Sequence, residues 1–281
     1  MSQKKVRLDV LLHQRGLFPS REAARRAIMA GLVRRAGERV DKPGTQVAPD
    51  ETFEVAGPEH PYVGRGGLKL ERALEVFDVS LADRVVVDVG ASTGGFTDCA
   101  LRHGARLVYA VDVGYGQLAW SLRQDPRVVV MERTNFRHVD PERFQPRPSV
   151  AVMDVSFISI RLLFEKLREV LEADGWVISL VKPQFEAGRE AVGKGGIVRD
   201  PSVHERVLFD VVRAARDAGM TCVGLDHSPI TGGDGNIEFL ACWRLGPHGG
   251  SEAVSERIPE VVRAAWRAFG RGPDASGGAR A

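Results

Sequence analysis

The feature that most constrains the fold is a regular alternation of apolar segments and amphipathic stretches beyond residue 68 of this 281-residue chain. Seven runs rich in branched and aromatic side chains fit buried strands, at 85–89, 107–111, 128–131, 150–153, 176–181, 221–225 and 239–243. Helical periodicity occupies most of the gaps, at 69–77, 96–103, 161–171, 202–217 and 252–268. The alternation predicts an α/β fold in which helices cover both faces of a mostly parallel sheet.

The first sixty residues follow a different pattern. A short helix is expected from Val6 to near Gly16, and Ser20 is a suitable N-cap for a second helix that Gly31 would end. Short β-like pieces follow, separated by Gly, Pro and Asp. These shifts predict a small separate domain at 1–60, a glycine-rich linker at 61–67, the α/β domain at 68–268 and a disordered tail at 269–281.

Positive charge is concentrated at the N-terminus. Residues 1–42 contain eleven Lys or Arg and four Asp or Glu, a local charge of +7, whereas the whole chain carries +2. A basic segment on a mildly acidic body indicates an arm that binds a polyanion. A solvated helix face is the alternative explanation. The candidate RNA contacts are Arg7, Arg21, Arg25, Arg26 and Arg65.

A glycine-rich turn follows the first predicted strand of the α/β domain. Its glycines would let the backbone approach a ligand closely, which is typical of nucleotide-binding turns. NAD is one candidate ligand, but Ser92 stands where a G-x-G-x-x-G turn has its second glycine. Asp88, two residues before the turn, favours S-adenosylmethionine, whose amino-acid end it would help to hold. The predicted cofactor residues of the turn are Gly90, Ala91, Ser92, Thr93, Gly94, Gly95 and Phe96.

Two further residues extend this cofactor site. Asp112 ends the next strand, where an acid can accept hydrogen bonds from both ribose hydroxyls. Its alternative role is to cap a turn. Asn135 follows the third strand and is expected to contact the adenine side of the cofactor.

Four ionisable residues lie at strand ends or helix starts of the same sheet, far apart in sequence. They are Lys69, Asp154, Lys182 and Glu238. Charged groups beside buried strand ends are costly unless they are paired or functional. Each could be a structural ion-pair partner, but open α/β sheets bind ligands at the carboxyl edge, where all four should converge. This convergence predicts a catalytic set.

The runs that carry these residues resemble a known family. The tetrad resembles the Lys-Asp-Lys-Glu set of FtsJ-like ribose 2′-O-methyltransferases. The N-terminal pattern Leu8-Asp9-x-x-Leu12, with Ser20-Arg21 and Gly31-x-Val33, resembles the S4 RNA-binding domain. Residues 4–267 together resemble the TlyA (haemolysin A) family, which joins the two.

The resemblance implies a Rossmann-like class I methyltransferase with a seven-stranded sheet and an N-terminal S4 domain. It implies S-adenosylmethionine as cofactor and methylation of a cytidine 2′-hydroxyl in the RNA of ribosomal subunits. We hypothesise that Lys182 is the base, because partial burial and the nearby Lys69 would destabilise its ammonium, and that Asp154 and Glu238 orient the lysines. The charges of the two carboxylates oppose this effect, so the sequence leaves open which lysine is the base. Orientation can contribute up to ~7–11 kcal/mol, against a ~10²–10⁴-fold factor for a general base.

Other chemistries fit less well. Amino-methylating enzymes usually have Pro-Pro-aromatic after the acid, where this chain has Val155-Ser156-Phe157, and cytosine-C5 enzymes need a nucleophilic cysteine. The family's older name suggests membrane lysis. The sequence shows neither a membrane-spanning segment nor a signal peptide to support that activity. A binding-only S4 protein with an inactive second domain is a further alternative. No metal site is expected, the protein is expected to be cytoplasmic, and the sequence leaves its oligomeric state open.

Overall fold

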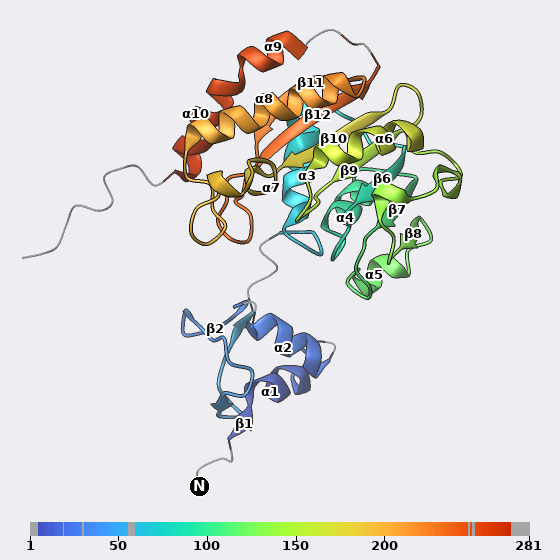
Figure 1. Cartoon of the computed structure of the whole chain (residues 1–281). Helices are drawn as coiled ribbons and strands as arrows, with labels where there is room; N and C mark the ends of the chain where they lie inside the picture. The colour runs from blue at the N-terminus through green and yellow to red at the C-terminus, as the bar shows by residue number, and fades with distance from the viewer. Residues whose placement is uncertain are drawn as a thin grey trace, which may run out of the picture. The chain divides into compact units, whose positions relative to one another are not determined.

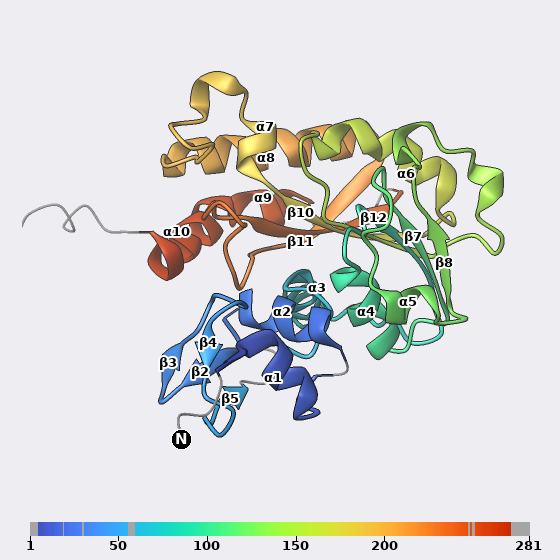
Figure 2. The same cartoon turned by 90° about the horizontal axis from the view of Figure 1, so that it is seen from below.

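The computed structural model describes residues 5–18, 20–29, 31–55, 60–246, 248 and 251–270. The chain forms two compact units, Met1–Pro61 and Tyr62–Ala281, which are drawn in Figures 1 and 2 and are treated separately below. The predicted tail falls largely at 271–281, outside the described residues.

The larger unit is built on a seven-stranded sheet with the strand order β11-β12-β10-β9-β6-β7-β8. Strand β12 pairs antiparallel with both of its neighbours, and the other pairs are parallel, so the predicted mostly parallel α/β sheet is confirmed. The strands are β6 (Val85–Val89), β7 (Leu107–Val111), β8 (Val128–Met131), β9 (Val150–Met153), β10 (Trp176–Val181), β11 (Met220–His227) and β12 (Phe239–Leu245).

Helices cover both faces of this sheet, as Figure 2 shows. Alternate residues of β6 explain why: Val85, Val87 and Val89 belong to one apolar cluster, whereas Val86 belongs to the other. The first cluster includes apolar residues of α6 (Phe164–Val170), α8 (Pro201–Asp217) and α10 (Ile258–Phe269). The second includes residues of α3 (Gly66–Phe77), α4 (Gly95–Arg102) and α5 (Trp120–Arg123).

Two details depart from the sequence expectations. Helix α3 begins at Gly66, inside the segment that was expected to be a linker, and Tyr62 is buried in the second apolar cluster. The single helix expected at 252–268 is divided at Arg257 into α9 (Ser251–Glu256) and α10. The short elements that complete this unit are α7 (Pro183–Glu186), η1 (Phe136–His138), η2 (Pro141–Arg143), η3 (Ile160–Leu163) and η4 (Arg189–Ala191).

The described part of the smaller unit contains two helices and two small sheets around an apolar cluster that includes Leu8, Leu12 and Ile28. The Ser20 hydroxyl accepts a hydrogen bond from the Ala23 backbone N–H at 3.1 Å, as expected of an N-cap. The elements are β1 (Val6–Arg7), α1 (Leu8–Gln14), α2 (Arg21–Met29), β2 (Val33–Arg35), β3 (Glu38–Arg39), β4 (Gln46–Val47) and β5 (Glu54–Val55).

The prediction of a helix from Val6 was wrong for its first two residues. Val6 and Arg7 pair with Val47 and Gln46 of β4, a strand that the sequence analysis did not identify. This pairing joins segments about forty residues apart, and local periodicity carries no signal for such a contact.

The strand order fixes where a ligand can bind. From β6 the chain adds β7 and β8 on one side and then returns to place β9 and β10 on the other. The carboxyl ends of β6 and β9 therefore flank the point at which the strand order reverses. Open α/β sheets form their ligand crevice at this point.

Candidate active site

The turn after β6 packs closely against the protein itself. A side chain at Gly90, whose φ is +86°, would place Cβ 3.0 Å from the backbone oxygen of Asp154. A Cβ at Gly95 would lie 3.0 Å from both the oxygen of Gly64 and the nitrogen of Gly67. The sequence analysis attributed these glycines to a close ligand approach, but their near neighbours are loops of the same unit.

Asp88 is fully buried beneath this turn. Its Oδ2 accepts a hydrogen bond from the Thr97 hydroxyl at 2.6 Å, and its Oδ1 has no hydrogen-bond partner among the described residues. Burial raises the pKa of Asp88 to about 7. Asp88 lines neither of the two cavities described below, so its visible contact is with the first turn of α4, which it helps to hold under the glycine turn.

Asp112 and Asn135 line a cavity of about 470 Å³ at the ends of β6, β7 and β8. Asp112 accepts hydrogen bonds from the backbone N–H groups of Ser92, at 2.8 Å, and Gly114, at 2.7 Å. The turn-capping role is therefore present, and each carboxylate oxygen keeps capacity for another donor. Asn135 is exposed and caps η1 through the Arg137 N–H. Apolar groups such as Val111 and Phe136 complete the walls.

The four predicted catalytic residues come together in space. Lys69 Nζ lies 2.6 Å from Glu238 Oε2 and 3.6 Å from Asp154 Oδ2. Lys182 Nζ lies 2.6 Å from Asp154 Oδ1 and donates to the Ser156 hydroxyl at 2.9 Å. The result is an alternating chain of charges, Glu238–Lys69–Asp154–Lys182.

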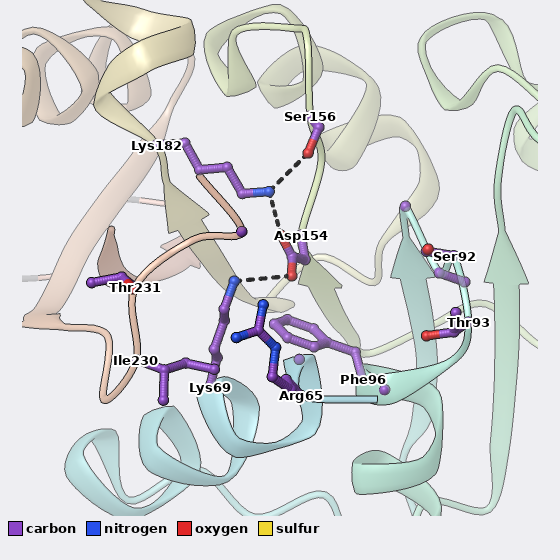
Figure 3. Close-up of a pocket in the computed structure, with 15 residues that line it drawn as sticks. Arg65, Lys69, Ser92, Thr93, Phe96, Asp154, Ser156, Lys182, Ile230 and Thr231 are labelled. Carbon is purple, nitrogen blue, oxygen red and sulfur yellow. Dashed lines mark hydrogen bonds and ion pairs between the residues drawn. The ribbon is translucent and has the colours of Figure 1, made fainter. Parts of the chain in front are cut away.

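This chain of charges is largely removed from solvent. The side chains of Lys69 and Lys182 are each 9% exposed and that of Glu238 is 3% exposed, whereas that of Asp154 is 21% exposed. Figure 3 shows both lysines reaching toward Asp154 from opposite directions. Two positive and two negative groups compensate one another, which is the condition for keeping charges in a buried site.

A second cavity, of about 270 Å³, opens above the tetrad. Lys69, Asp154 and Lys182 line it, and Arg65 does so from the segment just before α3. Phe96 also lines this cavity, and Figure 3 shows Arg65, Lys69 and Phe96 among its walls. The two cavities share four lining residues, Gly90, Ser92, Asp154 and Ser156, so they meet where β6 and β9 end.

The cofactor turn divides between these cavities. Gly90 and Ser92 border both, and Ala91, Thr93, Gly95 and Phe96 line only the tetrad cavity, whereas Gly94 lines neither. Ser156, Gln117 and the segment at 230–233 also line the cavities and were missed by the sequence analysis. For Ser156 a signal existed, because it lies two residues after Asp154 in the same loop.

The basic residues of the smaller unit are of two kinds. Arg7 and Arg21 both bond the buried carboxylate of Asp9, at 2.9 and 3.1 Å. Arg25 and Arg26 are exposed on α2 and form no ion pair within the described part of the chain. The latter two therefore have their full charge available to a polyanion.

Several other features limit the chemistry of the molecule. Cys99, Cys222 and Cys242 are buried. No group of three or more acidic, histidine or cysteine side chains within the described ranges could hold a metal ion. No helix in those ranges is long and apolar enough to cross a bilayer.

A reversed strand order, a glycine turn after β6 and an acid at the end of β7 define a Rossmann-like enzyme that binds a nucleotide-type cofactor. Comparison with known proteins identifies the family of this enzyme. The family model of FtsJ-like methyltransferases matches residues 62–245, and that of the S4 domain matches residues 6–53.

Similar proteins span almost the whole chain. The YqxC protein of Bacillus subtilis is 56% identical over 95% of this chain and 96% of its own length. A "16S/23S rRNA (cytidine-2'-O)-methyltransferase TlyA" of Mycobacterium tuberculosis is 44% identical over 92% of this chain and 98% of its own. A solved structure from Streptococcus thermophilus, named as a hemolysin, has 51% identity and a TM-score of 0.75 over 95% of this chain and 98% of its own.

The chain therefore belongs to the TlyA family of S4-containing, FtsJ-like methyltransferases. It is a methyltransferase, and its cofactor is S-adenosylmethionine.

Proposed function

We propose that the protein methylates the 2′-hydroxyl of a cytidine ribose in ribosomal RNA, in 16S and also in 23S RNA, on assembled or partly assembled subunits. The observation that carries this proposal is the junction of the two cavities at Gly90, Ser92, Asp154 and Ser156. One cavity has the walls of a nucleoside site, and the other is lined by Lys69, Asp154 and Lys182 of the tetrad. The relatives named above supply the substrate class.

The larger cavity fits the cofactor in size and chemistry. Its volume of about 470 Å³ is within the ~300–1,000 Å³ range of small-molecule sites. Asp112 would accept hydrogen bonds from the ribose hydroxyls, and Asn135 and Phe136 would contact the adenine. S-adenosylmethionine supplies a methyl group on a positively charged sulfur. The Gly90–Ser92 backbone would hold its amino-acid end, and Asp88 would support that backbone through Thr97 rather than by direct contact.

The tetrad would align the ribose hydroxyl and remove its proton. Lys182 is assigned as the base, because it borders the tetrad cavity beside Ser156 and Asp154. Lys69 would position the hydroxyl, with Glu238 and Asp154 fixing the two lysines in place. Alignment is the larger contribution, at up to ~7–11 kcal/mol. The extensive ion pairing of the tetrad is suited to this task.

RNA would be held by the smaller unit through Arg7, Arg21, Arg25 and Arg26, and near the tetrad by Arg65. Arg65 is exposed and lines the tetrad cavity, where a guanidinium can contact a phosphate beside the target ribose. Ribosomal substrates place the protein in the cytoplasm.

The test is methyl transfer from labelled S-adenosylmethionine to purified 30S and 50S subunits, followed by mapping of the modified nucleotide. We expect label on a cytidine ribose, and none with the Lys182→Ala variant at equal cofactor binding. Label on a base or on a phosphate would contradict the proposal. Cofactor binding without any transfer would instead favour a binding-only protein.

A further inference from the structure

A second buried carboxylate lies just behind the tetrad. Glu186 ends α7, four residues after Lys182, and its side chain is only 2% exposed. It is not among the lining residues of either cavity at the active site. Burial raises its pKa, so its position requires strong compensation by hydrogen bonds.

That compensation comes from the loop that follows β9. Glu186 Oε2 accepts hydrogen bonds from the Ser159 hydroxyl at 2.6 Å and from Arg161 Nε at 3.1 Å. Its Oε1 accepts from the Ile160 backbone N–H at 2.8 Å. Arg161 also donates to the backbone oxygen of Glu186 at 3.2 Å. One carboxylate therefore fixes three consecutive residues to the end of α7.

The same loop begins at Asp154, a member of the tetrad. Asp154 and Ser156 contact Lys182 at one end of the loop, and Glu186 holds residues 159–161 at the other. Between these two attachments Phe157 has a φ of +64°, a conformation that non-glycine residues rarely adopt. Its side chain is 91% exposed, and its ring lies 5.2 Å from that of Phe185.

We propose that Glu186 is a positioning residue that holds the 154–159 loop in this strained conformation, so that Asp154 and Ser156 face Lys182. A strained backbone persists only where its surroundings hold it in place. Without Glu186, the hydrogen bonds and ion pairs between the side chains of this loop and the described β10–α7 segment would all involve Lys182, and the ring contact of Phe157 with Phe185 would be the other side-chain contact. Lys182 would then have to orient the loop as well as act on the hydroxyl. This role rests on the proposed function of the tetrad.

The test compares Glu186→Ala and Glu186→Gln with the wild-type protein, and Glu169→Gln serves as the control. Glu169 is an exposed acid on α6 that pairs with Lys166, so its change removes one carboxylate charge from the same unit without touching the loop. We expect Glu186→Ala to lower kcat at saturating cofactor on the order of 10–100-fold, as for a group that orients other groups. Cofactor affinity should fall by a smaller factor, because residues 154–158 also line the cofactor cavity. Glu186→Gln keeps one acceptor oxygen and should recover part of the loss.

Hydrogen–deuterium exchange separates this inference from the function it rests on. In Glu186→Ala, exchange should increase in the 154–161 segment and remain unchanged in 85–90, whether or not the protein methylates the RNA that is supplied. Unchanged exchange in 154–161 would overturn the proposal. So would a full kcat in an active enzyme, or an equal increase of exchange in 154–161 and 85–90, which indicates a general loss of fold. Absence of methyl transfer in the wild-type protein would count against the proposed function alone.

Discussion

The two units of the molecule hold charge in opposite ways. In the larger unit, Lys69, Lys182 and Glu238 are buried and arranged with Asp154 in a chain of alternating sign. In the smaller unit most of the basic groups face solvent, and Arg21 remains 57% exposed even while it bonds Asp9. The comparison separates two uses of charge on one polypeptide.

The difference follows from solvation. Removing one partner of a buried pair leaves an uncompensated charge and typically costs about 3–5 kcal/mol, so the tetrad has to act as a unit. Exposed arginines contribute separately, because each neutralises about one phosphate and the effect is screened by salt. Changes in the tetrad should therefore abolish turnover, whereas changes in the basic face should weaken RNA affinity in small steps.

The largest effect is expected at Lys182. If it is the base, Lys182→Arg should lose about as much rate as Lys182→Ala, on the order of 10²–10⁴-fold, because arginine keeps its proton near neutral pH. Single-turnover rates at saturating cofactor measure this loss, and calorimetry should show an almost unchanged cofactor affinity.

Lys69→Arg is the matched comparison, since Lys69 is assigned to positioning and Arg can retain that in part. The wild-type rate should rise with pH through an ionisation that is missing in Lys182→Arg. A substantially active Lys182→Arg enzyme with the wild-type pH profile would exclude Lys182 as the base.

A smaller loss is expected at Asp112, within the cofactor cavity. Asp112→Ala removes an acceptor for the ribose hydroxyls and releases the backbone groups of Ser92 and Gly114. We expect S-adenosylmethionine affinity to fall about 10–100-fold, as for a charge-assisted hydrogen bond of ~1.5–3 kcal/mol, with RNA binding unchanged. Asp140→Ala is the control, because Asp140 caps η2 outside both active-site cavities. Equal cofactor affinities in both variants would refute the ribose assignment.

Two buried aspartates extend the comparison to stability. Asp88 has a pKa raised to about 7 by burial, whereas hydrogen bonds from Arg7 and Arg21 lower the pKa of Asp9 below its usual 3.8. The stability that Asp88 contributes is full below pH 3.8 and is lost as the pH rises through about 7. Asp9 contributes above pH 3.8, and its contribution is lost in acid.

Asp88→Asn should accordingly raise the melting temperature above pH 7, because the amide imitates the neutral carboxyl and still accepts from Thr97. Asp9→Asn should lower the stability of the smaller unit at neutral pH. Melting curves at pH 5 and pH 8 test both variants. A lower melting temperature for Asp88→Asn at pH 8 would show that its charged form is required in the fold.

The smallest effect is expected on the basic face. Arg25→Ala should reduce the salt slope of ribosomal RNA binding by about 1, because one phosphate contact is lost. Arg21→Ala should change the slope less, since Asp9 already neutralises part of its charge. Filter binding over a series of salt concentrations measures both slopes. An unchanged slope for Arg25→Ala would indicate that the basic side chains of α2 only form a solvated helix face and do not contact RNA.

Much of the larger unit could be predicted because its signals are local. The parallel strands are mostly apolar runs, as at 107–111 and 150–153, and runs of this kind are typical of strands buried on both faces of a parallel sheet. The convergence of Asp154 and Lys182 followed from the rule that parallel strands end at one edge. Lys69, at a helix start, and Glu238, at the start of an apolar strand, were expected at the same edge, and the structure brings all four residues together.

The sequence by itself determined the α/β class, the strand boundaries of the parallel core and the identity of the tetrad, because side-chain periodicity and strand ends specify them locally. Only the tertiary structure decided which groups contact one another. In the structure Asp88 does not line the cofactor cavity, Arg7 and Arg21 pair with Asp9, and Glu186 bonds the loop after β9. These contacts depend on the packing of segments distant in sequence, where a buried charge is stable only beside the partner that the fold supplies.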